Sequence, residues 1–139
     1  MNKILAIDYG SKRVGLAVTD TQQIIASGLT TVKTSDLMVY LKEYFLSNMV
    51  ECVVVGHAKN LDNTLSESSK YIEPFVLRLK KAYPELRIER IDERFTSKMA
   101  FQTMIDSGIS KKARSNKALV DQISATIILQ SFLDSRGRG

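Results

Sequence analysis

Three carboxylate residues stand at positions where the surrounding sequence should not tolerate them. Asp8 ends the apolar run Ile4–Ile7, Glu93 follows the β-like run Ile88–Asp92, and Asp121 interrupts an apolar helical stripe. Moving a carboxylate out of water costs several kcal/mol unless it is paired, hydrogen-bonded or metal-bound. Hard oxygen ligands suit Mg²⁺ or Mn²⁺. The pattern therefore predicts that the three residues share a divalent cation and act as catalytic and metal-binding residues in phosphodiester hydrolysis.

Asp121 gives the sharpest signal, because it lies on one face of a helix predicted over residues 116–133. This face follows helical spacing through Ala118, Asp121, Ala125, Ile128 and Phe132. We therefore expect the Asp121 side chain to point toward packed protein. The alternative is a buried aspartate that is satisfied by Arg94, Lys98 or a backbone amide.

The other two positions also have structural explanations. Asp8 could simply begin a turn, and Asp92 could cap a turn while Glu93 pairs with Arg94 in solvent. Since adjacent residues of an extended chain point to opposite faces, only one of Asp92 and Glu93 should join Asp8. The metal-site prediction rests on the three carboxylates together.

Basic residues gather near the end of the chain. Residues 111–139 hold six Lys or Arg against two Asp, which is +4 of the net charge of +5. Lys111, Lys112 and Arg114 precede Asp121, where they could hold a polyanion beside the metal. A solvated basic surface is the alternative.

The chain has one histidine and one cysteine, which exclude multi-histidine and cysteine zinc sites. His57 follows Gly56 at a strand end, where it could contact a phosphate or aid proton transfer; a loop histidine without such a role is the alternative. Cys52 lies in the apolar run Val50–Val55, so we expect a buried thiol in a reducing compartment.

The pattern of apolar residues and turn signals predicts an α/β protein. Strands are expected over residues 3–7, 14–18, 24–32, 50–55 and 86–91, and helices over 35–48, 64–83, 97–107 and 116–133, with Pro74 kinking the second helix or starting it anew. The order β-β-β-α-β-α-β-α-α describes a five-stranded mixed sheet with helices on both faces. Ligand sites form beyond the carboxyl ends of parallel strands, where Asp8, the Gly56 loop and Asp92–Glu93 are expected.

Length and composition are those of one globular domain over residues 1–139. Hydrophobic residues make up 44% of the chain and charged residues 25%. The N-terminal segment reaches Asp8 too soon for the apolar core of a signal peptide, and no other segment approaches membrane-spanning length. We therefore expect a soluble cytoplasmic protein with no membrane association.

The combined motifs resemble the YqgF family, also called RuvX-like Holliday junction resolvases or pre-16S rRNA nucleases, which has an RNase H-like fold. The resemblance runs nearly end to end and is carried by Ile7–Ala17, by Val54–Gly56 with Asn60–Asp62, by Ile91–Thr96 and by Asp121–Gln130. One departure is Gly56-His57-Ala58, where the family usually has Gly-Leu-Pro. This change bears on loop geometry or substrate choice, whereas the acidic positions are intact.

The resemblance implies that Asp8, Glu93 and Asp121 are the acidic active-site positions of a single RNase H-like nuclease domain. It makes Lys12, Arg13 and Arg94 candidate substrate contacts. It also implies a structured nucleic-acid substrate, with 5′-end processing of precursor 16S rRNA in ribosome biogenesis preferred over cleavage of branched DNA. Ribosomal or transcription-complex partners and a monomer or homodimer are compatible with it.

Two other classes remain open from the sequence. The Asp8–Ser11 segment is also similar to the phosphate loop of actin-like ATPases and sugar kinases, but those enzymes hold nucleotide between two related domains. A noncatalytic module that binds RNA or a transcription complex would keep the fold and the basic surface. Such a module would bind RNA equally well after substitution of Asp8.

Overall fold

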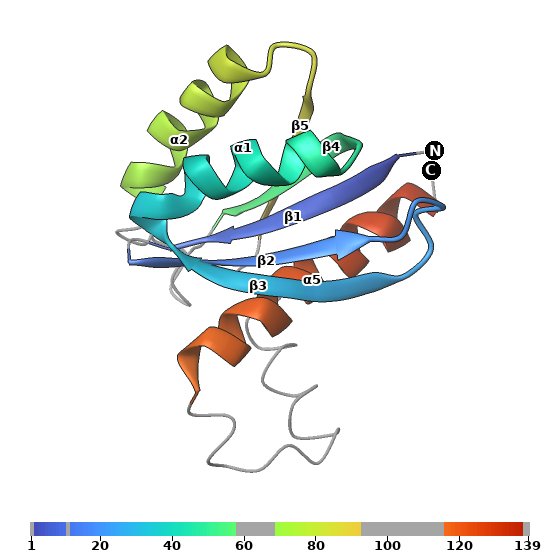
Figure 1. Ribbon diagram of the computed structural model, residues 1–139. Helices are drawn as coiled ribbons and strands as arrows, with labels where there is room; N and C mark the ends of the chain where they lie inside the picture. The colour runs from blue at the N-terminus through green and yellow to red at the C-terminus, as the bar shows by residue number, and fades with distance from the viewer. Residues whose placement is uncertain (1, 11, 58–68, 93–115, 138–139) are drawn as a thin grey trace.

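The computed structural model describes residues 2–10, 12–57, 69–92 and 116–137 (Figure 1). The predicted helix over residues 97–107 lies outside them. The elements in chain order are β1 (Lys3–Tyr9), β2 (Arg13–Thr19), β3 (Ala26–Lys33), the 3-10 turn η1 (Thr34–Asp36), α1 (Leu37–Ser47), β4 (Val50–His57), α2 (Ser69–Ala82), β5 (Arg87–Asp92) and α5 (Lys117–Gly137).

The strands form one mixed sheet with the order β3-β2-β1-β4-β5. The first three strands are antiparallel neighbours, whereas β1, β4 and β5 run parallel to one another. Short turns join the antiparallel strands, and the parallel strands are reached through helices, as parallel pairing requires. The predicted five-stranded mixed sheet is confirmed.

Helices cover both faces of the sheet. Figure 1 shows α1 and α2 on one face and α5 on the other. Because side chains alternate along a strand, Leu5 and Ile7 of β1 pack in the core under α1 and α2, whereas Ile4 and Ala6 pack under α5. Burial on both faces explains why the central strands are continuous apolar runs in the sequence.

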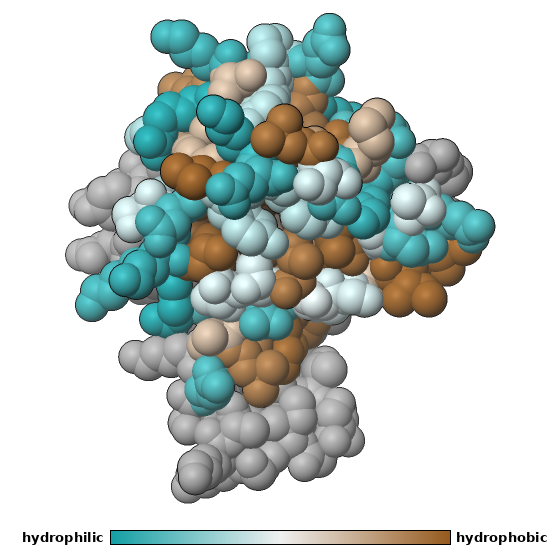
Figure 2. Space-filling model, in the orientation of Figure 1, coloured by the Kyte–Doolittle hydropathy of each residue, from teal (hydrophilic) through white to brown (hydrophobic). Residues whose placement is uncertain are grey.

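Aromatic side chains organise the core under α1 and α2. The ring of Phe75 stacks on that of Tyr9 with centroids 4.9 Å apart, and Phe45 meets Tyr83 edge to face at 5.0 Å. Burial raises the pKa of the Tyr9 hydroxyl above its usual range. The outer surface of this layer is mostly hydrophilic, with single apolar side chains between polar ones (Figure 2).

Several element boundaries differ from the sequence prediction, most of them by one or two residues. Strand β3 begins at Ala26, because the Asp20 carboxylate accepts hydrogen bonds from the backbone N–H groups of Ile24 and Ile25, at 2.8 and 3.0 Å, and holds them in a loop. Helix α2 runs through Pro74 to Ala82 without interruption, so a new start at Pro74 is wrong. Helix α5 continues past the predicted end to Gly137.

Within the described part of the chain, no helix has the length and hydropathy needed to cross a bilayer. Cys52 is a free thiol with 3% of its surface exposed, as the sequence predicted. Desolvation raises its pKa to about 11.

This burial predicts an unreactive cysteine. At pH 8 a thiol with that pKa is roughly one-thousandth ionised, about a hundredfold less than a thiol at its ordinary value. Reaction of the native protein with a disulfide reagent should therefore be slow and should become fast in guanidinium chloride. Equal rates in both conditions would contradict the burial of Cys52.

Candidate active site at the carboxyl ends of the parallel strands

Asp8 lies near the end of β1 with a glycine beside it on each neighbouring strand. It pairs with Gly15 on β2 and with Gly56 on β4. Paired residues of neighbouring strands project from the same face of a sheet. Because both partners of Asp8 are glycines, no side chain from β2 or β4 occupies the space directly beside it. The face is that of α5, because Ala6 and Val54, two residues earlier on β1 and β4, both pack in the α5 core.

Helix α5 enters this space above Gly15. A Cβ atom placed on Gly15 would lie 2.9 Å from the Cβ of Asp121 and closer still to the Asp121 carbonyl oxygen. The helix backbone therefore rests directly on the backbone of β2, which only glycine permits here. Since Gly15 is the register partner of Asp8, this contact brings Asp121 next to Asp8 on one face of the sheet.

Two polar contacts fix the start of α5. Asn116 caps the helix, its side-chain oxygen accepting from the N–H groups of Ala118 and Leu119 at 3.1 and 3.3 Å. The Thr31 hydroxyl of β3 donates to the carbonyl oxygen of Ala118 at 2.7 Å. These contacts set where the first turns of α5, and with them Asp121, lie along the sheet.

Arg13 holds the Asp121 carboxylate. Its Nε donates to a carboxylate oxygen of Asp121, and the side chains are 38% and 19% exposed, respectively. The prediction that Asp121 points toward packed protein is confirmed. Among the described residues Arg13 of β2, which the sequence suggested only as a substrate contact, is a cationic partner of Asp121. Arg94 and Lys98 lie outside the described residues, so that alternative stays a prediction.

The turn that follows Asp8 is tied to the end of β3. Thr34 donates its hydroxyl to the Gly10 carbonyl oxygen at 2.7 Å, and its backbone N–H donates to the Lys12 carbonyl oxygen at 3.1 Å. This threonine was missed in the sequence, where only its place between a strand and a helix was visible. It holds the backbone on which Lys12 is exposed to solvent.

The remaining predicted residues are placed only in part. His57 and Asp92 are register partners at the ends of β4 and β5, on the same sheet edge as Asp8. The others lie outside the described residues: Glu93, Arg94, Lys111, Lys112 and Arg114. Among the side chains that are described, no group of three histidine, cysteine or carboxylate residues is arranged to hold a metal ion.

The donor set nevertheless fits a hard cation. Asp8 and Asp121 supply carboxylate oxygens from a rigid strand and a rigid helix, which is the ligand type that Mg²⁺ and Mn²⁺ prefer. The Arg13 guanidinium carries one positive charge, whereas the two carboxylates carry two negative charges. A divalent cation is therefore compatible with the charge of these three side chains.

Sequence comparison places the whole chain among known relatives. A family model described as RuvX, Holliday junction resolvase, matches residues 2–135. A protein named "Putative pre-16S rRNA nuclease" from Flavobacterium psychrophilum is 57% identical over 96% of this chain and 97% of its own length. Proteins with the same name from Bacteroides fragilis and Porphyromonas gingivalis are 54% and 51% identical, over 98% and 99% of this chain and 99% and 100% of theirs.

Solved structures show the same fold at low identity. The chain is similar to Thermus thermophilus RuvC in complex with a Holliday junction substrate, with a TM-score of 0.58 and 18% identity over 99% of this chain and 97% of that one. It is also similar to the fowlpox virus Holliday junction resolvase, with a TM-score of 0.55 and 14% identity over 96% and 99%. The predicted RNase H-like fold is confirmed.

The close approach of α5 predicts that Gly15 cannot be replaced. Gly15→Ala should lower the free energy of unfolding in urea by about 1–3 kcal/mol, because the new methyl group overlaps the backbone of Asp121. Gly28→Ala is the matched control on β3, since its Cβ would meet only side chains of α5, at 3.4 Å or more. That change should stay within about 0.5 kcal/mol of wild type. Equal effects of the two substitutions would contradict the backbone contact.

Thr34 should stabilise the turn through its hydroxyl. Thr34→Val keeps the shape of the side chain but leaves the Gly10 carbonyl without this donor, so we expect a loss of about 1 kcal/mol in urea unfolding. Thr34→Ser retains the hydroxyl and should recover most of that stability. A serine variant as unstable as the valine variant would show that the methyl group matters instead.

Proposed function

The chain belongs to the RuvX family, and we propose that it is a metal-dependent endonuclease that hydrolyses phosphodiester bonds in structured nucleic acid. The observation that carries this proposal is the meeting of Asp8 and Asp121 at the carboxyl end of the parallel strands. Relatives more than half identical over nearly the whole chain are named as nucleases, which supports the same chemistry. We assign the activity to a single nuclease domain over residues 1–139.

Asp8 and Asp121, together with Glu93, would hold one or two Mg²⁺ or Mn²⁺ ions. Such an ion lowers the pKa of bound water and stabilises the charge that develops in attack on phosphorus. The protein contributes the positioning. Strand β1 fixes Asp8, and the ion pair with Arg13 orients the Asp121 carboxylate, so little reorganisation is needed when substrate binds.

Basic side chains around the carboxylates would bind the phosphate backbone. Lys12 is exposed on the turn after Asp8, and Arg13 keeps part of its surface accessible beside Asp121. We propose the same role for the remaining predicted contacts: His57, Arg94, Lys111, Lys112 and Arg114. Phosphate contacts of this kind position a substrate without reading its sequence.

Precursor 16S rRNA is our preferred substrate, processed at its 5′ end in the cytoplasm during ribosome biogenesis. The names of the relatives that are 51–57% identical support this choice. Branched DNA is the second candidate, favoured by the family description. A junction resolvase needs two active sites, so a homodimer would favour the DNA substrate and a monomer would favour the RNA substrate. Ribosomal or transcription-complex partners would supply further selectivity.

The test is cleavage of labelled precursor 16S rRNA and of a four-way DNA junction with Mg²⁺ or Mn²⁺. Asp8→Asn should lower the rate by at least about a hundredfold, because it removes a charged oxygen ligand and keeps the side-chain shape. Asp36→Asn changes an exposed carboxylate of η1 and should cleave like wild type.

Circular dichroism and urea unfolding should be the same for both variants and the wild type. Full activity of a folded Asp8→Asn protein would refute the assignment of the acidic site. RNA binding without cleavage by the wild type, under any of these metal conditions, would instead favour a noncatalytic binding module.

A further inference from the structure

Lys33, a residue that the sequence motifs do not include, lies on the same face of the sheet as the acidic pair. In the register of β2 and β3, Lys33 is directly opposite Arg13 and Thr31 is directly opposite Gly15. Gly15 faces α5, and Arg13 and Thr31 both bond to α5. Because paired and alternate residues share a face, the Lys33 side chain also projects on the α5 side.

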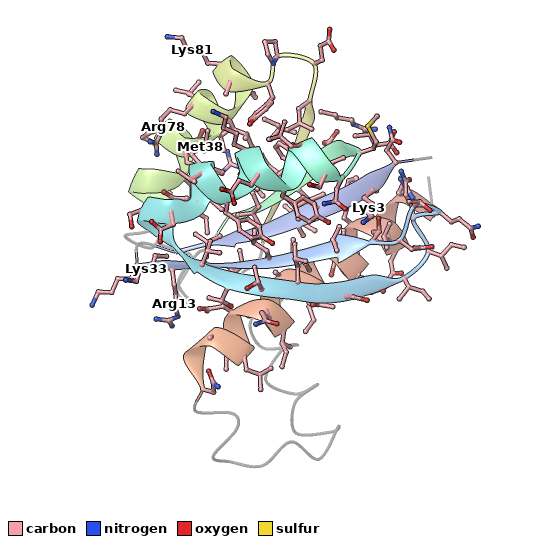
Figure 3. All side chains as sticks on the ribbon, in the orientation of Figure 1. Lys3, Arg13, Lys33, Met38, Arg78 and Lys81 are labelled. Atoms are coloured by element: carbon pink, nitrogen blue, oxygen red, sulfur yellow. The ribbon has the colours of Figure 1, made fainter. Side chains whose placement is uncertain are left out.

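The opposite faces of the same strands confirm this orientation. Val14 is buried under α1 and α2, and its register partner Val32 packs against the same core. Lys33 follows Val32 directly and therefore points the other way. In Figure 3 the side chains of Arg13 and Lys33 extend from the same end of the sheet.

The backbone of Lys33 is set apart from that of Asp8 on the same face of the sheet. Asp8, Gly15 and Thr31 form one row across β1, β2 and β3, and Lys33 is two residues further along β3. Two strand spacings and two residues of rise place its Cα about 12 Å from that of Asp8. An exposed lysine whose backbone stands here, beside Arg13, can meet a neighbouring phosphate of a strand whose scissile phosphate lies at the carboxylates.

We propose that Lys33 binds a backbone phosphate next to the cleaved one, so that the substrate strand runs from β1 over β2 toward β3. This assignment rests on the proposed nuclease function and adds the path of the substrate across the sheet edge. Along that path β1 supplies the Asp8 carboxylate, β2 supplies the Arg13 guanidinium that pairs with Asp121, and β3 supplies the phosphate contact of Lys33. Lys33 is therefore a binding residue that does not touch the reacting atoms.

The experiment compares Lys33→Ala, Lys33→Arg and Lys81→Ala. Lys81 is an exposed lysine at the end of α2, on the opposite face of the sheet, and is the matched control (Figure 3). Binding of a labelled precursor 16S rRNA fragment is measured in the Asp8→Asn background at several salt concentrations. Cleavage of the same RNA is measured with Asp8 intact.

We expect Lys33→Ala to weaken binding about 3- to 10-fold and to reduce the slope of log affinity against log salt by about 0.7–0.9, the value for one lost phosphate contact. KM should rise while kcat stays within about twofold, because the contact is the same in the ground and transition states. Lys33→Arg keeps the positive charge and should leave affinity and KM unchanged. Lys81→Ala should bind and cleave RNA like the protein in which both lysines are intact.

Unchanged affinity, salt slope and KM in Lys33→Ala would overturn the assignment of Lys33 and leave the nuclease proposal standing. A loss of the same size in Lys81→Ala would also overturn it, because it would show a nonspecific charge effect. If the wild type binds RNA but does not cut it, the nuclease proposal fails while the binding data still decide the role of Lys33. Absence of RNA binding by the unmodified protein would overturn both.

Discussion

The contact between α5 and β2 at Gly15 is the constraint on which the site depends. Asp8 and Asp121 come from opposite ends of the chain. Gly15 is the register partner of Asp8, and it lets the α5 backbone rest on the strand at the level of Asp121. A side chain at this position would hold the helix away from the sheet and separate the two carboxylates.

Charge distribution follows from the same arrangement. The Arg13 guanidinium is paired with Asp121, on the face of the sheet to which Asp8 also belongs. Carboxylate oxygens of this kind are the ligands that the proposed divalent cation prefers. Lys12 and Lys33 are both exposed, and exposed positive charge attracts polyanions such as the proposed substrate.

The two hydrophobic cores, one on each face of the sheet, hold the strand that carries Asp8 in a fixed position. Helices α1 and α2 bury one face of the strands and α5 the other, so β1 is packed on both sides up to the residue before Asp8. Asp8 then stands at the strand ends, where ligands bind in open α/β sheets. The same fold in proteins of 14–18% identity shows that this packing tolerates extensive changes of sequence.

For the part of the chain that the structure describes, the sequence by itself determined the strands, the helices and the inward orientation of Asp121, because apolar periodicity depends only on local spacing. Tertiary structure decided that Arg13 is the partner of Asp121, that Thr34 holds the turn after Asp8 and that Gly15 admits the helix. These facts depend on strand register and on which elements meet, and neither is encoded in the spacing along one segment. The start of β3 likewise required the side chain of Asp20, which competes with the strand for backbone N–H groups.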